Sequence, residues 1–196
     1  PRPLASFKDR FYAVAMSSDS VPVCAQLGAQ MMSFAQKPWA QMKDHFDTYR
    51  RLFKEHHGRE AKPPICVDFL ACDESAEKAE ALAREHMANY YVTVMDHYEM
   101  AGDHFKNMKG YGDYANNASL LKDLGMTDAG NAFVDINTWG TPNQILEKLE
   151  QRQRDLGDFD LTVQVSYGGM SKENAESGIR LFAEKVLPEV QSWKRS

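Results

Sequence analysis

The sequence has no long hydrophobic run and no excess of basic residues, and each absence excludes a class of protein. No stretch of its 196 residues approaches the roughly 20 apolar residues that span a membrane. Acidic residues outnumber basic ones by 28 to 23, and this net charge of −5 argues against a nucleic-acid-binding protein, which needs a basic surface. We therefore expect a cytoplasmic protein that binds neither nucleic acid nor a membrane.

Cysteine is also scarce, and the sequence lacks the common catalytic motifs. Its three cysteines, Cys24, Cys66 and Cys72, form no C-x-x-C pair, so we expect reduced, buried thiols. The six histidines show no spacing that is typical of a metal site, and we predict no bound metal. Walker, G-x-S-x-G and H-E-x-x-H motifs are absent, so nothing in the sequence supports a hydrolase.

The beginning and the length of the chain bear on its organisation. The chain opens with Pro1-Arg2-Pro3, without an initiator methionine or the apolar core of a signal peptide, and we expect it to be part of something longer. At about 150 residues per domain, residues 1–196 are predicted to form a single domain.

Short apolar runs alternate with longer amphipathic stretches, which is typical of a parallel α/β protein. The apolar runs predict four buried strands: Tyr12–Met16, Gln30–Ala35, Ile65–Ala71 and Leu161–Tyr167. The amphipathic stretches predict helices at Val21–Leu27, from after Pro38 to about His57, from an N-cap at Asp73 to about Met100, from Thr141 to about Leu156, and from Ser171 to about Trp193.

Two architectures are compatible with this alternation. An open doubly wound sheet is one, and part of a (β/α)8 barrel is the other, since a complete barrel needs eight strands. The stretch 101–137 fits the alternation poorly and is predicted to be an irregular insertion, with a short helix near Ala118–Leu124. Composition and spacing do not choose between the two architectures.

A cluster of hydroxyl groups follows the first predicted strand. Ser17, Ser18 and Ser20 lie between that strand and the start of a helix. Ligands of α/β proteins bind where strands end, and the backbone N–H groups of a helix N-terminus favour phosphate there. The competing interpretation is that Asp19 or Ser20 simply caps the helix. Spacing alone favours capping.

Two further features are weaker candidates. The turn Tyr167–Met170 holds two glycines that would let a phosphate approach the backbone, although a plain tight turn explains them as well. His97 and His104 lie in a tyrosine-rich segment, where either could act as an acid or base if that segment covered a cleft. An exposed loop or a subunit contact is the alternative for both histidines.

Three groups of segments, in chain order, resemble one known family. They are Arg10–Ser20 with Ala25–Gly28, then Gln36–Trp39 with Tyr49, Arg50 and Gly58, and finally Trp139–Gln144, Leu161–Val165, Gly168–Met170 and Leu181–Pro188. The helix start G-T-P-x-Q and the ending G-G-M…L-F-A-x-x-V-x-P are fairly specific together. These segments resemble the C-terminal half of luciferase-like flavin-dependent monooxygenases, and Asp96–Glu99 is similar to a subgroup of them.

The resemblance implies a fold and a chemistry. Members are (β/α)8 barrels that use reduced flavin mononucleotide (FMN), or in some branches a deazaflavin, to insert one oxygen atom into a small organic substrate. The four predicted strands would then be barrel strands five to eight. The family holds the flavin phosphate partly at the turn after strand five, which corresponds to Ser17, Ser18 and Ser20. No catalytic residue follows from this correspondence.

The correspondence also leaves strands one to four of the barrel without a counterpart here. Such a half exposes two sheet edges and an apolar interior. The chain is therefore either a fragment of an active enzyme or a half that pairs with another half. A non-catalytic module for assembly or dimerisation is the alternative function. The expected partners are a small organic substrate, a flavin reductase, and either a second copy or a separate N-terminal half.

Overall fold

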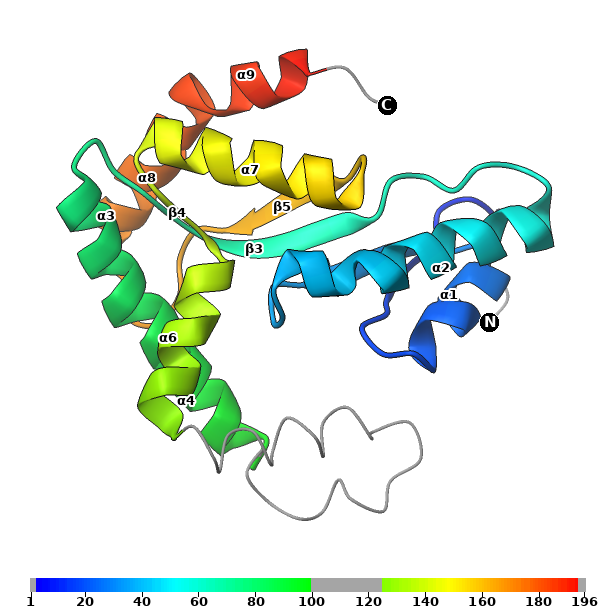
Figure 1. Cartoon of the computed structure of the whole chain (residues 1–196), viewed down its shortest axis with the longest axis horizontal. Helices are drawn as coiled ribbons and strands as arrows, with labels where there is room; N and C mark the ends of the chain where they lie inside the picture. Colours follow the sequence, from blue (N-terminus) through cyan, green and yellow to red (C-terminus); the bar gives the residue numbers. More distant parts are fainter. Residues whose placement is uncertain (1–2, 100–124, 194–196) are drawn as a thin grey trace.

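The computed structural model describes residues 3–99 and 125–193, which form a parallel sheet flanked by helices (Figure 1). The strands of this part of the chain are β1 (Tyr12–Val14), β2 (Gln30–Phe34), β3 (Ile65–Cys72), β4 (Thr138–Gly140) and β5 (Asp160–Gln164). β1 pairs with β2 and β2 with β3, while β3 also pairs with β4 and β5, and every pairing is parallel. The four predicted strands are confirmed. β4 was not predicted, because three residues are too few to show a period.

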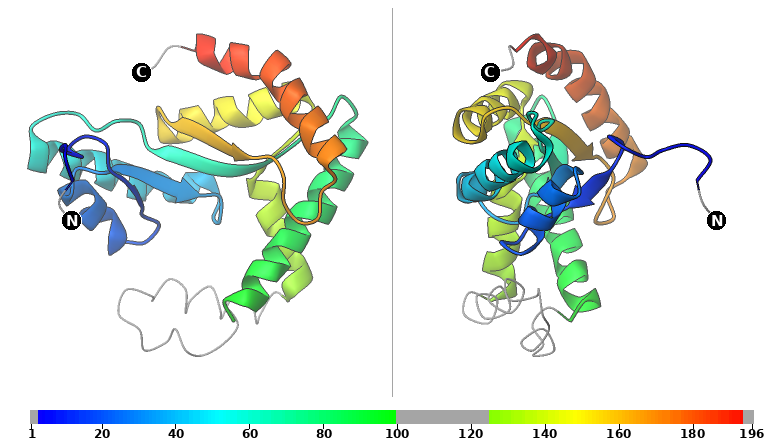
Figure 2. Two further views of the ribbon diagram at one scale, coloured as in Figure 1. Left: turned by 180° about the vertical axis from the view of Figure 1, so that it is seen from behind. Right: turned by 90° about the vertical axis from the view of Figure 1, so that its right-hand side faces the viewer.

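Helices follow the strands on the surface of the sheet. They are α1 (Ser20–Gln26), α2 (Trp39–His57), α3 (Ala76–Leu82), the π-helix η1 (Ala83–Met87), α4 (Ala88–His97), α6 (Met126–Ile136), α7 (Pro142–Leu156), α8 (Lys172–Lys185) and α9 (Leu187–Ser192). α2 and α7 lie side by side along one face of the sheet (Figure 1). α4 continues directly from α3 and η1, and it runs beside α6 beyond the end of β3 (Figure 2).

Local signals set most helix ends, but one predicted cap was wrong and the last predicted helix is divided. α7 follows Thr141, the predicted start, with a capping box: the Thr141 N–H donates to Gln144 Oε1 at 2.9 Å and the Gln144 N–H donates to Thr141 Oγ1 at 3.4 Å. Ser75, not Asp73, caps α3: its hydroxyl accepts the Lys78 N–H. The last predicted helix is divided into α8 and α9, since Pro188 has no N–H to continue the first.

The stretch predicted as an irregular insertion is partly helical. α6 occupies 126–136 and buries Ala129, Gly130, Phe133 and Val134, whose spacings of three and four residues are those of a helix face. The helix predicted at Ala118–Leu124 lies outside the described residues.

The two faces of the sheet have different surroundings. On the outer face, Met31 and Cys66 pack against the apolar stripe of α2, in which Trp39, Met42, Phe46, Tyr49 and Phe53 are all buried. The inner face carries the aligned residues Val14, Met32 and Ile65. Its β1 end is open, with the Val14 side chain 54% exposed.

A buried ion pair links the outer face to α7. Arg152 donates from Nη2 to Asp68 Oδ2 at 2.7 Å, and both side chains are almost completely buried, at 3% and 0% exposed. The Thr138 hydroxyl donates to the same carboxylate oxygen. The Arg152 guanidinium also lies 4.2 Å from the centre of the Trp39 ring. This cluster joins β3, β4, α2 and α7.

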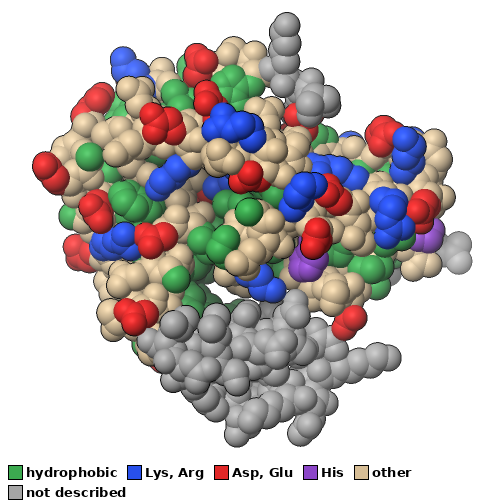
Figure 3. Space-filling model, viewed as in Figure 1, with side chains coloured by type: hydrophobic (Ala, Val, Ile, Leu, Met, Phe, Trp, Pro, Cys, Tyr) green, Lys and Arg blue, Asp and Glu red, His purple; other side chains and the backbone are tan. Residues whose placement is uncertain are grey.

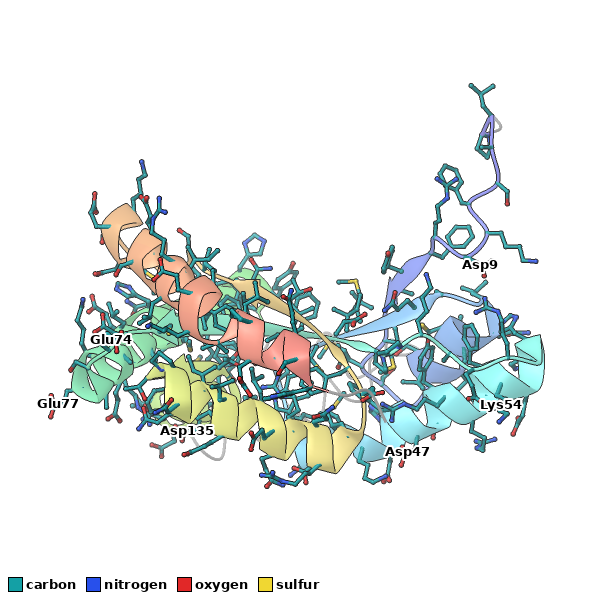
Figure 4. All side chains as sticks on the ribbon, turned by 90° about the horizontal axis from the view of Figure 1, so that it is seen from above. Asp9, Asp47, Lys54, Glu74, Glu77 and Asp135 are labelled. Atoms are coloured by element: carbon teal, nitrogen blue, oxygen red, sulfur yellow. The ribbon has the colours of Figure 1, made fainter. Side chains whose placement is uncertain are left out.

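The outer surface over α2 and α7 is charged, with basic and acidic side chains interspersed (Figure 3). Asp47 and Lys54 project from the solvent side of α2, while the segment with Asp9 extends away from the body (Figure 4). No helix in the described ranges is long and apolar enough to cross a membrane.

Candidate functional site

The candidate site lies where the parallel strands end. All strands run in the same direction, so the loops after β1, β3 and β5 meet at one edge of the sheet. The loop after β1 contains the three predicted serines and leads into α1. The loop after β5 contains the glycine turn.

Ser17 and Ser20 build the turn after β1. The Ser20 hydroxyl accepts the backbone N–H groups of Met16 and Ser17, at 3.1 and 3.0 Å. The Ser17 hydroxyl donates to Ser20 Oγ at 2.9 Å and accepts the Ser20 N–H at 3.1 Å. Both hydroxyl groups are therefore occupied in holding the backbone of this turn.

Ser18 stands apart from the other two serines. Its side chain is exposed, and neither its hydroxyl nor its backbone N–H has a hydrogen-bond partner among the described residues. The same is true of the Asp19 N–H, and the Asp19 side chain does not cap α1. Two N–H groups and one hydroxyl at the strand end thus have no hydrogen-bond partner among the described residues. Such a donor set fits a phosphate group, whose oxygens accept hydrogen bonds.

The turn after β5 is tightly packed. The Met170 N–H donates to the Tyr167 carbonyl at 2.9 Å, and Gly168 and Gly169 both have positive φ angles, 57° and 78°. A Cβ at Gly168 would lie 1.9 Å from the His86 carbonyl oxygen. His86 Nδ1 is 3.1 Å from the Gly168 carbonyl oxygen. The glycines let the backbone approach η1, as in the tight turn that the sequence favoured.

An aromatic cluster covers the inner face beside this turn. Phe69 contacts the rings of Tyr90, Phe133 and Tyr167, with ring centres 4.4, 5.6 and 4.7 Å apart. The Tyr167 hydroxyl donates to the Leu70 carbonyl at 2.8 Å, and burial raises the pKa of this phenol. The cluster makes an apolar wall at the carboxyl end of β3.

The remaining candidates lie away from these groups or outside the described residues. His97 is exposed at the end of α4, and its ring contacts that of Tyr98. His104 lies outside the described residues. Within 3–99 and 125–193, no three His, Cys, Asp or Glu side chains are grouped as metal ligands would be. All three cysteines are free and buried, as predicted.

Burial makes the thiols poor nucleophiles. It raises the pKa of Cys24 to about 11 and the pKa of Cys72 to about 12, and it also raises the pKa of Cys66. A thiolate is the reactive form of cysteine, so these groups contribute no nucleophile at neutral pH.

A comparison with protein families decides which family this arrangement belongs to. Residues 1–158 match the family model described as luciferase-like monooxygenase. The chain belongs to the luciferase-like monooxygenase family. A comparison with curated protein sequences gives no significant match.

Solved structures of luciferase-like and related enzymes share the fold. The oxygenating constituent of 3,6-diketocamphane monooxygenase from Pseudomonas putida, in complex with FMN, matches with a TM-score of 0.62 at 13% identity and covers 91% of this chain and 48% of its own. Monooxygenase RslO1 from Streptomyces bottropensis matches with a TM-score of 0.58 at 19% identity, and the match covers 90% of this chain and 47% of its own. The coenzyme F420-dependent tetrahydromethanopterin reductase from Methanopyrus kandleri matches with a TM-score of 0.56 at 15% identity, and the match covers 91% of this chain and 50% of its own.

These matches choose between the two predicted architectures. The fold is that of luciferase-like (β/α)8 barrel enzymes, and the chain spans about half the length of these neighbours, as expected for part of a barrel. The resemblance seen in the sequence is confirmed. The sequence missed the different roles of the three serines and the contact of His86 with the glycine turn, because both depend on hydrogen bonds that leave no periodic signal.

Proposed function

We propose that this chain is the phosphate-binding half of an FMN-dependent monooxygenase that inserts one oxygen atom into a small organic substrate. The donor groups of Ser18 and Asp19, which have no partner among the described residues, carry the proposal, because they lie at the strand edge where barrels bind phosphate. Membership of the family supports it. We further propose a cytoplasmic location, since the thiols are unpaired.

The three serines have two roles in this proposal. Ser18 donates directly to the phosphate from its hydroxyl and backbone N–H. Ser17 and Ser20 hold the turn so that these donors are arranged before the ligand arrives, which lowers the entropic cost of binding.

The inner face has the second role, which is to exclude water from the reaction. When bound, reduced FMN would supply the redox chemistry of the reaction with oxygen. Met32, Ile65 and Val67 give the sheet an apolar inner face, and the aromatic cluster around Phe69 covers its carboxyl end. Water exclusion of this kind protects reactive groups from hydrolysis and strengthens polar contacts.

Binding of FMN and of riboflavin, which lacks the phosphate, tests the proposal. We expect the chain to bind FMN more tightly, and Ser18→Ala to weaken FMN binding about tenfold, as expected for one hydrogen bond to a charged group. Riboflavin binding should not change in this variant. Calorimetry or quenching of flavin fluorescence measures both affinities, with reduced FMN titrated under anaerobic conditions.

Ser192→Ala, at the end of α9, is the matched control and should leave both affinities unchanged. Equal affinities for FMN and riboflavin, or FMN binding that does not saturate, would refute the phosphate site. Coenzyme F420 in the same assay tests the deazaflavin alternative, which the F420-dependent neighbour from Methanopyrus kandleri supports.

The second candidate function is a non-catalytic assembly module. Its support is the exposed apolar surface at the β1 edge, where Tyr12 is 59% and Val14 is 54% exposed. This surface would pair with a separate N-terminal half or with a second copy. A flavin reductase remains the proposed source of reduced flavin only for the enzymatic function.

A further inference from the structure

The sheet has an open strand edge at each of two ends. Along the path from β1 through β2 and β3 to β5 every pairing is parallel, and within the described ranges β1 pairs only with β2 and β5 only with β3. The short β4 pairs with the carboxyl end of β3 and covers neither edge. Four strands are half of a (β/α)8 barrel, so four further parallel strands would join the two edges.

Exposed apolar side chains lie at the same two ends. At one end they are Tyr12 and Val14 of β1, with Val23 and Leu27 one turn apart on α1. At the other end Ile179 of α8 is exposed and lines a largely apolar hollow of about 370 Å³. The helices α1, α2, α7 and α8 pack against one another in this order, so a barrel continued in the same sense brings α8 against a further α1. The two ends therefore complement each other.

We propose that a second copy of this chain closes the barrel. A two-fold axis along the barrel keeps all eight strands parallel, and it places β1 of each copy beside β5 of the other. Both open edges are then paired, and the Ser18 turns of the two copies lie at the same mouth. The proposal gives the second candidate function a definite partner. It rests on the barrel fold and not on flavin binding.

The shear of the sheet predicts how the two edges align. One row across the four strands consists of the aligned residues Val14, Met32, Ile65 and Asp160. This row begins at the last residue of β1 and ends at the first residue of β5. A (β/α)8 barrel shifts such a row by eight residues in a full turn, or by about four for each half. Continued in the same direction, the row passes from Asp160 to Arg10 of the second copy, and Gln164 lies beside Val14 of that copy.

The charges at this seam are complementary. Among the described residues, the Arg10 guanidinium contacts only its own segment, namely the Phe7 ring at 5.2 Å and the Ser6 carbonyl. The Asp160 carboxylate accepts the Gln30 amide N–H at 3.0 Å. Closure of the barrel brings Arg10 of one copy to Asp160 of the other, and opposite charges favour this alignment. Pairing of β1 with β1 of a second copy would leave both β5 edges open.

Disulfide crosslinking tests the predicted contact. In a chain that carries both Val14→Cys and Gln164→Cys, mild oxidation should give a covalent species of about twice 22.2 kDa, in which position 14 of one copy is linked to position 164 of the other. Non-reducing electrophoresis and peptide mass spectrometry identify the link. The native thiols are buried, so they should stay reduced.

Two controls accompany this variant. Val14→Cys alone should not crosslink, because the closed dimer places its two β1 strands on opposite sides of the barrel. Val14→Cys combined with Gln151→Cys, on the exposed side of α7, should not crosslink either.

Sedimentation velocity of the unmodified chain gives the second measurement, and we expect a dimer that does not grow further. A chain that stays monomeric would overturn the proposal and leave a separate N-terminal half as the occupant. A series of larger species, a crosslink in Val14→Cys alone, or no crosslink in the double variant would also overturn it. FMN titration of Ser18→Ala is a separate measurement, so either proposal can fail while the other stands.

A charge reversal tests the seam without cysteine. Arg10→Glu places two carboxylates side by side and should raise the dimer Kd about tenfold, because like charges oppose association. Adding Asp160→Lys restores opposite charges and should recover most of the affinity. Arg154→Glu, on the exposed side of α7, makes the same change of charge away from the seam and should leave the Kd unchanged. Equal Kd values for Arg10→Glu and the unmodified chain would contradict the predicted alignment.

Discussion

At the scale of single residues, the Asp68–Arg152 pair shows how much one buried charge depends on its partner. Among the described residues, Asp68 Oδ1 and the Arg152 atoms Nε and Nη1 are buried without hydrogen-bond partners, so the contacts of Oδ2 with Nη2 and with the Thr138 hydroxyl carry most of the compensation. Removing one charge leaves the other in a medium that solvates it poorly.

We predict that Arg152→Met lowers the free energy of unfolding by about 3–5 kcal/mol, because Asp68 is left buried and unpaired. The double variant Asp68→Leu, Arg152→Met should lose less than the single variant. Urea denaturation measures both. Arg180→Ala is the control: it breaks the exposed pair with Glu176 and should leave stability nearly unchanged. A double variant less stable than Arg152→Met would contradict this account.

Only part of the arrangement at this scale could be predicted from the sequence. It located the serine turn, because a hydroxyl-rich segment between a strand and a helix is a local pattern. It did not reveal the partner of Asp68, since the two residues lie 84 positions apart and no periodicity links them. The acid inside the apolar run Ile65–Ala71 was the one available sign of a buried charge.

At the scale of elements, the turn after β5 and the π-helix η1 form one packed unit. The backbone of Gly168 approaches that of His86 more closely than any side chain would allow, and the His86 ring contacts the Gly168 carbonyl. Sequence reasoning predicted the tight turn. The His86 side chain itself is buried.

Alanine substitutions at the two glycines should therefore differ. Gly168→Ala should lower the free energy of unfolding by at least about 3 kcal/mol, because η1 must move away from the new Cβ. Gly169→Ala should cost only about 1 kcal/mol, the strain of a positive φ, since its Cβ would meet nothing within 4 Å. Chemical denaturation of the two variants is the measurement. Equal losses of unfolding free energy would show that η1 moves away from the new Cβ at no energetic cost, which would contradict the prediction.

Most elements were predictable because their signals are local. The capping box of Thr141 and Gln144 and the apolar stripe of α2 each lie within one segment. β4 was missed because its three residues pair only with the end of β3, a contact set by tertiary structure. α6 was missed because the long polar stretch before it obscured its apolar face.

At the scale of the whole molecule, three strands of the sheet have a single partner within the described ranges. β1 pairs only with β2, and β4 and β5 each pair only with β3. Apolar side chains are exposed along the β1 edge, and unpaired strand edges with apolar neighbours favour association. The family resemblance of the sequence, which implies half a barrel, predicted this tendency to associate.

We predict that the isolated chain associates at micromolar concentrations and that Val14→Lys shifts it toward the monomer. A lysine on an edge strand opposes pairing, because its charge would have to be buried. Sedimentation velocity over a concentration series measures the effect. Leu187→Lys, on α9 and 39% exposed, is the control and should not change the distribution. A chain that stays monomeric throughout would contradict the prediction.

The inertness of the three native thiols has a practical consequence. Because they are buried and stay protonated at neutral pH, maleimide reagents should leave them untouched in the folded chain. A cysteine introduced at an exposed position would then be the only site of attachment for a fluorophore or spin label. Distances across the open barrel half could be recorded without first replacing any native residue.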